Sequence, residues 1–285
     1  MNNQDGFLVI DKPEGITSHD VVAKARKLLG TKRVGHAGTL DPMATGVLVL
    51  GVNKATKFLQ YAMEGKKRYL AVIELGVSTT TDDKEGDTIE VLPTGSISDE
   101  KLISELSNFK GAISQVPSAV SAKKVGGKRA YDLVREGAQF QLKAREILIE
   151  NLKILKIDRS KSLTVKIDIT CSAGTYIRAI ARDLGKSLKV GGHLTELRRI
   201  AAYPYEEGDA KPLEEAKLIP LLEAVTKMMP VRTLNEDEVR DLRFGRQIRE
   251  SKFSGIGAGV TESGEVIAII HNLESRAQPL TVLHP

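Results

Sequence analysis

Cysteine is nearly absent from this 285-residue chain, which contains only Cys171. A single cysteine excludes an intrachain disulfide and a cage of thiolate metal ligands. Cys171 ends a segment of alternating apolar residues, where we expect a small buried side chain rather than a nucleophile. The five histidines show no spacing typical of metal ligands, so we predict that the protein holds no metal.

Long hydrophobic runs are also missing. Apolar stretches such as 47–50 are far shorter than the roughly 18 residues that a membrane-spanning helix needs. The segment 1–15 lacks the basic and apolar regions of a signal peptide. We therefore expect a cytoplasmic protein without a membrane partner. Hydrophobic residues nevertheless make up 41% of the chain and charged residues 28%, as in globular proteins that fold.

Two glycine-rich segments lack the features of nucleotide-binding loops. Segment 255–259 (GIGAG) does not have the G-x-G-x-x-G spacing of dinucleotide-binding proteins. Segment 33–46 (RVGHAGTLDPMATG) lacks the Gly-Lys-Ser/Thr ending of a phosphate-binding loop. Neither class of nucleotide cofactor is therefore expected.

The net charge of +5 is unevenly distributed. Segment 123–145 contains seven lysines and arginines against two acidic residues, and segment 178–199 contains six against two. Such a pattern fits either a surface that binds a polyanion or two solvated helix faces. Charge alone favours neither alternative.

Hydrophobic spacing predicts a mixed α+β core. Five segments have a clear period: strands are expected at 66–76 and 163–171, and helices at 18–29, 98–108 and 177–188. Ser18 and Ser98 are the expected N-caps, and Gly30 is expected to end the first helix. Segment 47–50 is too apolar for its period to distinguish a buried strand from a buried helix.

The composition changes after Lys211. Segment 212–234 contains three prolines and a short helical run, which predicts a closing helix followed by a linker. The remaining residues favour a helix from Asn235 and a pair of strands around 262–265. We expect two domains, 1–228 and 229–285, of which the second is small and β-rich.

The loop 33–46 carries polar side chains suited to chemistry. His36, Thr39 and Asp41 lie among glycines that allow a tight bend and the close approach of a ligand. Asp41 is the one carboxylate there, and its local alternative is a helix N-cap followed by Pro42. His36 is equally suited to a turn or to stacking and proton handling.

Two long segments, VIDKPEGITSHD at 9–20 and GHAGTLDPMATGVLVLGVNKATKF at 35–58, enclose this loop. With them the sequence resembles the TruB-type tRNA pseudouridine synthases, whose catalytic aspartate lies in a G-H-x-G-x-L-D-P loop. Further segments follow in the family's order: KKRYLAVIELG at 66–76, PSAVSAKKVGGKRAYDLVREG at 117–137, CSAGTYIRAIARDLG at 171–185 and HLTELRR at 193–199. The likeness covers roughly residues 5–205, and the tail after about Arg232 resembles a PUA-type RNA-binding domain.

This resemblance implies the fold and the reaction. The fold would be a mixed, largely antiparallel sheet of the pseudouridine synthase type with flanking helices, followed by the PUA-like domain. The reaction would convert the T-loop uridine, position 55 of tRNA, to pseudouridine on a flipped-out base. The implied partner is the tRNA T-stem-loop, and no cofactor is needed because the isomerisation involves no net redox change. We expect a monomer.

The resemblance also implies the catalytic residues. Asp41 matches the aspartate that attacks the sugar or stabilises its cationic character, a role suited to a carboxylate. Both a sugar adduct and elimination to a glycal remain open. Arg178 matches the arginine that pairs with that carboxylate, and its local alternative is a surface arginine at a helix start. Tyr69 matches a tyrosine that packs on the base and transfers a proton, although alternation alone makes it a strand aromatic.

The remaining implied residues bind the substrate. Tyr176 and Leu197 match residues that sandwich the uracil, although either also fits a plain core position. His36 matches the side chain that fills the space left by the extruded base. Lys124 would hold phosphates of the stem-loop. Asp83 aligns with an acidic residue that assists flipping, although the neighbouring Thr80 departs from the family pattern.

Two other functions fit parts of the same sequence. A dyskerin-like synthase shares the aspartate loop but acts inside a guide-RNA particle, and activity on bare tRNA would argue against it. An RNA-binding or RNA-folding module without catalysis would keep its function after Asp41→Asn. The joint presence of Asp41, Tyr69 and Arg178 favours an enzyme.

Overall fold

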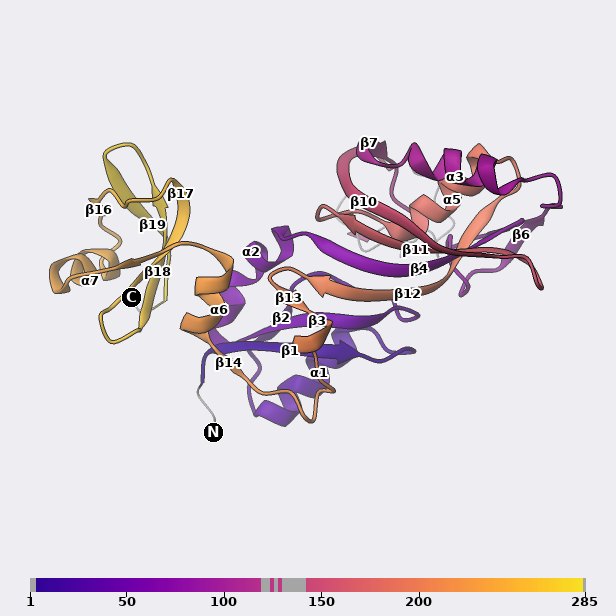
Figure 1. Cartoon of the computed structure of the whole chain (residues 1–285). Coiled ribbons are helices and arrows are strands. Elements are labelled where there is room, and N and C mark those ends of the chain that lie inside the picture. Colours follow the sequence, from indigo (N-terminus) through magenta and orange to yellow (C-terminus); the bar gives the residue numbers. More distant parts are fainter. Residues whose placement is uncertain (1–3, 119–123, 126–127, 130–141, 284–285) are drawn as a thin grey trace.

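The computed structural model describes residues 4–118, 124–125, 128–129 and 142–283. These residues form a ten-stranded, mostly antiparallel sheet and a separate five-stranded sheet near the C-terminus (Figure 1). The predicted mixed α+β class with a small C-terminal β-rich domain is thereby confirmed. Among these residues, no helix combines the length and apolar character required to cross a membrane.

The strands of the large sheet follow the order β14-β1-β3-β12-β4-β11-β10-β7, with β2 and β13 attached to β3 and β12. Their bounds are β1 Gly6–Lys12, β2 Val34–His36, β3 Thr45–Val52, β4 Lys67–Leu75, β7 Gly111–Gln115, β10 Arg145–Asp158, β11 Leu163–Cys171, β12 Gly192–Ala202, β13 Tyr205–Glu206 and β14 Ile219–Pro220. Strands β3 and β12 pair in parallel, and β12 and β4 lie side by side at the centre.

Shorter elements surround this sheet. Two strand pairs lie outside it: β5 Val77–Thr79 with β6 Thr88–Val91, and β8 Lys124–Val125 with β9 Lys128–Arg129. Before position 229, the residues that the structure describes form helices α1 Ser18–Leu29, α2 Leu59–Glu64, α3 Asp99–Ser107, α5 Ile177–Ser187 and α6 Leu221–Met228, with 3₁₀ turns η1 Asn53–Phe58 and η2 Glu207–Asp209.

The two faces of the large sheet bury different cores. One core joins α1, α3 and α5 to inward-facing residues of β1, β3, β4, β10 and β11. In Figure 1, α3 and α5 lie over β10, β11 and β4, whereas α1 lies beside β1 at the other end. The second core covers the opposite face of β1 and β3 with η1 and α6. Strand β3 is therefore buried on both faces, which explains why segment 47–50 is uniformly apolar.

The structure confirms the strands and helices predicted from hydrophobic spacing. Segments with a period of two form β4 and β11, and the three helical segments form α1, α3 and α5. Ser98 caps α3 through Lys101 N, and Gly30 ends α1 with a positive φ of 64°. The predicted N-cap of α1 is wrong by one residue. Thr17 is the cap and forms a capping box with Asp20.

The C-terminal sheet has the order β15-β17-β18-β19-β16. Its elements are β15 Val231–Thr233, α7 Glu236–Arg243, β16 Ile248–Arg249, β17 Gly255–Val260, β18 Val266–Asn272 and β19 Arg276–Val282. Asn235 caps α7, and β17 and β18 form the hairpin expected around 262–265. Side chains of α6 pack against this sheet, so α6 connects the two parts of the molecule (Figure 1).

Candidate active site

The loop between β2 and β3 places Asp41 at the edge of a cavity, and contacts on both sides of Asp41 hold that loop. The Ser18 hydroxyl donates to the Leu40 carbonyl (3.0 Å) and accepts from the Leu40 amide (2.8 Å). Lys12 Nζ donates to the carbonyl of Pro42 at 3.2 Å and to that of Ile16 at 2.7 Å. No helix follows Asp41, so its alternative as a helix N-cap is wrong.

Arg178 meets Asp41 in a two-contact ion pair. Arg178 Nε lies 3.0 Å from Asp41 Oδ2, and Arg178 Nη2 donates to Asp41 Oδ1 at 3.0 Å. Arg178 Nη1 lies 3.2 Å from Asp83 Oδ2 and donates to the Thr81 carbonyl at 3.0 Å. The Arg178 side chain is 6% exposed, which excludes the surface-arginine alternative. One guanidinium thus holds two carboxylates in a planar, multidentate arrangement.

Asp41 combines partial burial with charge compensation. Its side chain is 32% exposed, toward the cavity. Withdrawal from water raises the pKa of Asp41, the Arg178 guanidinium opposes that rise, and the carboxylate of Asp83 adds to it. Arg178 is therefore the main group that favours the ionised form of Asp41, with a smaller contribution from Lys12.

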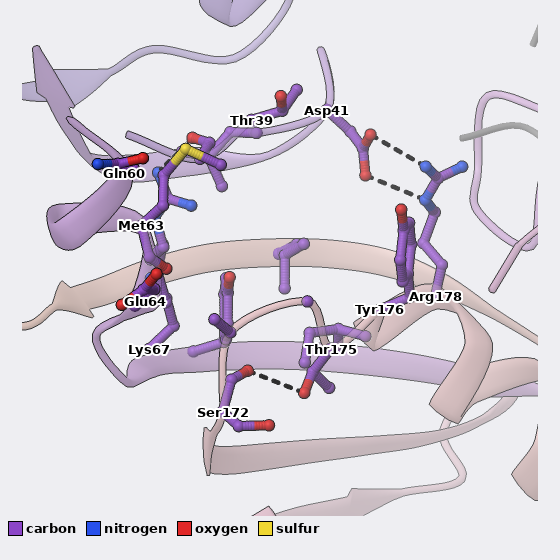
Figure 2. A pocket seen from close by; sticks show the side chains of 18 residues that line it. Thr39, Asp41, Gln60, Met63, Glu64, Lys67, Ser172, Thr175, Tyr176 and Arg178 are labelled. Carbon is purple, nitrogen blue, oxygen red and sulfur yellow. Dashed lines mark hydrogen bonds and ion pairs between the residues drawn. The ribbon is translucent and has the colours of Figure 1, made fainter. Parts of the chain in front are cut away.

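The cavity beside Asp41 has a volume of about 540 Å³. Figure 2 shows Asp41, Arg178 and Tyr176 at one side, with Gln60, Met63, Glu64 and Lys67 at the other. Tyr69 of β4 and Leu197 of β12 contribute to the same lining. The cavity thus combines apolar and aromatic surface with a few polar and charged groups, among them the Asp41–Arg178 pair, as is usual for a small-molecule site.

The strand positions explain how Tyr69 and Leu197 reach the cavity. Tyr69 is the third residue of β4, and its Cα partner in β12 is Arg199, two residues from Leu197. Burial raises the pKa of the Tyr69 phenol, with the Arg199 guanidinium acting against the rise, so Tyr69 is neutral at physiological pH. Tyr176 directly precedes α5 and lines the cavity from that side.

The other predicted site residues, Asp83, His36 and Lys124, differ in how they relate to the cavity. Asp83 is 3% exposed and contacts the site through Arg178. His36 is half-buried, packs edge-on against His19 with ring centroids 5.3 Å apart, and is not among the described residues that line the cavity. Lys124 begins β8, and its side chain lies outside the part of the chain that the structure describes.

Sequence reasoning overlooked three buried cations: Lys67 and Arg199 line the cavity, and Lys12 holds the loop that carries Asp41. Lys12 and Arg199 are 0% and 1% exposed, and Lys67 is 5% exposed. Arg199 Nε donates to the Val47 carbonyl (2.7 Å) and Arg199 Nη2 to the Gly38 carbonyl (3.2 Å), beyond the two ends of the Asp41 turn. Lys67 Nζ donates to the Gly65 carbonyl at 2.5 Å. The alternation of β4 and β12 could have revealed two of these cations. Lys67 lies on the same strand face as Tyr69, and Arg199 on the same face as Leu197.

The arginines of the basic segment 178–199 are largely occupied by contacts within the molecule. Arg178 and Arg199 are buried, and Arg198 pairs with Asp11 and Glu207. Arg182 contacts Asp82 and Asp183. Arg178, Arg182 and Arg198 thus form ion pairs with acidic residues of the chain, whereas Lys186 and Lys189 are exposed.

Cys171 is fully buried, and burial raises the pKa of its thiol to about 11. A thiol of that pKa is not a nucleophile at neutral pH, as expected for a small core side chain. Across the described residues, no group of three or more histidine, cysteine, aspartate or glutamate side chains is arranged to hold a metal ion.

Solved structures resemble this fold. The chain matches a Cbf5–Nop10–Gar1 complex with a TM-score of 0.75 and 24% identity over 100% of this chain and 87% of the other. A structure of an H/ACA RNP bound to a substrate RNA containing 2′-deoxyuridine matches with a TM-score of 0.72 and 23% identity, over 98% and 85% of the two chains. At such identities the likeness concerns the fold.

Sequence comparisons cover nearly the whole chain. Residues 26–177 match the TruB family pseudouridylate synthase (N terminal domain), residues 178–225 the tRNA pseudouridylate synthase B C-terminal domain, and residues 229–284 the tRNA Pseudouridine synthase II, C terminal. Proteins named tRNA pseudouridine synthase B from Thermobifida fusca and Paenarthrobacter aurescens are 46% and 45% identical, covering 98% of this chain and 98% and 95% of theirs. With its paired aspartate in the G-H-x-G-x-L-D-P loop, this chain belongs to the TruB family of pseudouridylate synthases.

Proposed function

We propose that this protein isomerises uridine to pseudouridine in the T-loop of tRNAs, acting on a base extruded into the cavity beside Asp41. The observation that carries this proposal is the two-contact ion pair between Asp41 and Arg178 in a cavity lined by aromatic and apolar side chains. The names of relatives that cover 98% of this chain support tRNA as the substrate.

The chemistry of the reaction fits these residues. The bond between C1′ and N1 of uridine breaks, the uracil turns, and a bond forms between C1′ and C5. N1 gains a proton and the hydrogen on C5 leaves as a proton, so atoms and electrons balance without an external reactant. We propose that the enzyme uses neither a cofactor nor a metal.

Asp41 acts in its ionised form. Either route, attack on C1′ or removal of a sugar proton to form a glycal, requires a carboxylate rather than a carboxylic acid. Arg178 supports that form because its two contacts oppose, in part, the rise in the Asp41 pKa that withdrawal from water causes. The glycosidic bond would break next to a charge that is held in place before the substrate binds.

The aromatic and apolar residues bind the base. Tyr176 and Leu197 enclose the uracil, and Tyr69 packs on it with a hydroxyl that carries a proton as the neutral phenol. Such contacts replace part of the stacking that the uridine loses when it leaves the RNA. His36 fills the vacated space, Lys124 binds a phosphate, and Asp83 supports the site through its contact with Arg178.

The remaining parts of the proposal concern organisation. Residues 1–228 form the catalytic domain and 229–285 a PUA-like RNA-binding domain. The protein acts as a monomer in the cytoplasm on the T-stem-loop. We expect an isolated T-stem-loop RNA to suffice as substrate.

Tritium release from such an RNA, labelled at uridine C5, tests the reaction. We expect release by the wild type without added cofactor or guide RNA, and none by Asp41→Asn, with the RNA affinity of the two proteins within a few-fold. Absence of release by the wild type despite RNA binding would refute the proposal and favour a guide-dependent enzyme or a binding module. Release by both proteins would refute the role of Asp41.

A further inference from the structure

The start of α5 is held by a side chain from another element. Tyr176 is its N-cap residue and makes no side-chain cap hydrogen bond. Helix starts leave backbone N–H groups that need partners. Gln115 of β7 meets the Tyr176 peptide groups instead: its Nε2 donates to the Tyr176 carbonyl (3.0 Å), and its Oε1 accepts from the Tyr176 amide (2.9 Å).

Gln115 is 2% exposed, so this contact is buried. A buried amide is costly unless both of its polar ends are paired, and here each end meets one backbone group of the same residue. Two opposed hydrogen bonds fix both the position and the rotation of the Tyr176 main chain. A hydrophobic side chain would fill the same space without this directional control.

The ring of Tyr176 is held as well. Arg145 of β10 is the Cα partner of Gln115 in the sheet, and its guanidinium carbon lies 5.6 Å from the centre of the Tyr176 ring. Gly174 makes room for this contact, because a Cβ there would lie 2.9 Å from Arg145 Nη1. Two cross-strand neighbours thus hold one cavity residue, by its backbone and by its ring face.

We propose that Gln115 is a positioning residue of the active site, setting the Tyr176 ring against the target base and the Arg178 guanidinium against Asp41. Arg178 lies two residues after Tyr176, in the first turn of α5, so displacement of the Tyr176 peptide shifts both side chains. The inference rests on the proposed function, since it assigns Gln115 a part in the same reaction.

The test compares Gln115→Met and Gln115→Glu with the wild type. Methionine has similar length but makes neither hydrogen bond, and glutamate keeps only the acceptor for the Tyr176 amide. We expect a kcat for tritium release lower by about 10- to 100-fold in Gln115→Met, since small displacements of reacting groups have effects of this size. The KM of Gln115→Met for the stem-loop RNA stays within twofold of the wild-type value. The kcat of Gln115→Glu lies between those of the wild type and Gln115→Met. Ser114→Ala, an exposed position on the same strand, is the matched control.

The pH profile separates positioning from general stability. Asp41 is faced by Arg178 from α5, by Asp83 and Glu85 from the loop after β5, by Lys12 from the end of β1 and by Tyr69 from β4. Weaker pairing with Arg178 moves the acid limb of kcat to higher pH in Gln115→Met, whereas a loss of folded protein lowers the amplitude at every pH alike. Gln115→Glu gives the same comparison if Gln115→Met does not fold.

Wild-type kcat and an unmoved acid limb in a folded Gln115 variant would overturn the inference, as would a loss confined to KM or to thermal stability. The two proposals fail separately. If the wild type releases tritium and Asp41→Asn does not, a normal Gln115 variant refutes only the positioning role. If the wild type releases none, the proposed function itself fails.

Discussion

Replacing Arg178 by methionine removes the cation that two carboxylates share. Arg178 contacts Asp41 through two nitrogen atoms at 3.0 Å and Asp83 through a third at 3.2 Å. Methionine fills much of the same volume without charge. The variant therefore leaves both carboxylates without their cation, and Asp83, which is 3% exposed, loses it in a buried setting.

The size of the effect follows from these exposures. Removal of one partner of a buried ion pair costs about 3–5 kcal/mol of folding free energy. Asp41 opens onto the cavity and contributes little to this cost, and Asp83 keeps hydrogen bonds from Thr81 Oγ1 and the Glu85 amide. We therefore expect the lower end of that range, about 3 kcal/mol at pH 8. At roughly 2–4 °C per kcal/mol, the Tm falls by roughly 6–12 °C.

The loss of stability increases with pH. Burial already raises the pKa of Asp41 in the presence of Arg178, and without Arg178 the folded protein holds carboxyl protons to still higher pH. The unfolded chain then binds fewer protons than the folded one, and the free energy of unfolding falls as pH rises above about 4, the usual carboxyl pKa. The difference in Tm between wild type and Arg178→Met should widen from pH 5 to pH 8.

Thermal melts at pH 5, 6, 7 and 8 measure this difference, and Arg178→Met/Asp83→Asn is the matched control. The double variant removes the buried charge and should recover most of the lost stability at pH 8. It should not recover tritium release, which we expect to fall by about 100-fold or more in both variants because Asp41 has lost its cation. An equal Tm difference at all pH values, or no recovery in the double variant, would refute the reasoning.

Three further predictions concern the elements that hold the site. Gly46→Ala should destabilise the protein by about 2 kcal/mol or more in urea unfolding, because φ is +98° and a Cβ would lie 2.2 Å from the Arg199 carbonyl; Gly95→Ala, with open space, is the control. Burial lowers the pKa of Lys67 to about 8. Between pH 8 and about 10 only the unfolded chain keeps that proton, so stability rises with pH, and Lys67→Met should reduce this rise in Tm but not abolish it, because burial also lowers the pKa of Lys12 to about 8. Cys171 should react with Ellman's reagent only after unfolding, and a fast reaction of the native protein would contradict its burial.

Local sequence patterns predicted those parts of the fold that depend on local physics. The alternation in 66–76 and 163–171 predicted β4 and β11 because one face of each strand is buried. Ser98 caps α3 as expected because its hydroxyl has no competing tertiary partner among the described contacts. Ser18 failed as a cap since its hydroxyl bonds to the Leu40 backbone, a partner 22 residues away that no local pattern reveals.

The candidate site illustrates the same limit. The pattern around Asp41 and Pro42 also fits a helix start, and only the fold shows that the partner of Asp41 is Arg178, 137 residues later. The family resemblance named both residues but not their geometry. Arg199 was overlooked because it stands beside Arg198 in a segment that charge alone presents as one basic surface. In the structure Arg199 is 1% exposed, whereas Arg198 pairs with Asp11 at the surface.

The contacts around Asp41 bear on how the enzyme meets its substrate. Three separate elements hold the backbone of the loop: α1 through Leu40, the end of β1 through Pro42, and β12 through Gly38 and Val47. These anchors lie on both sides of Asp41, and Arg178 fixes its carboxylate directly. A group held from both sides in the absence of substrate loses little freedom on binding, so its electrostatic effect is available as soon as the base arrives. Much of the conformational cost then falls on the RNA, which has to leave its stacked form to bring the uridine to a carboxylate that is already held in place.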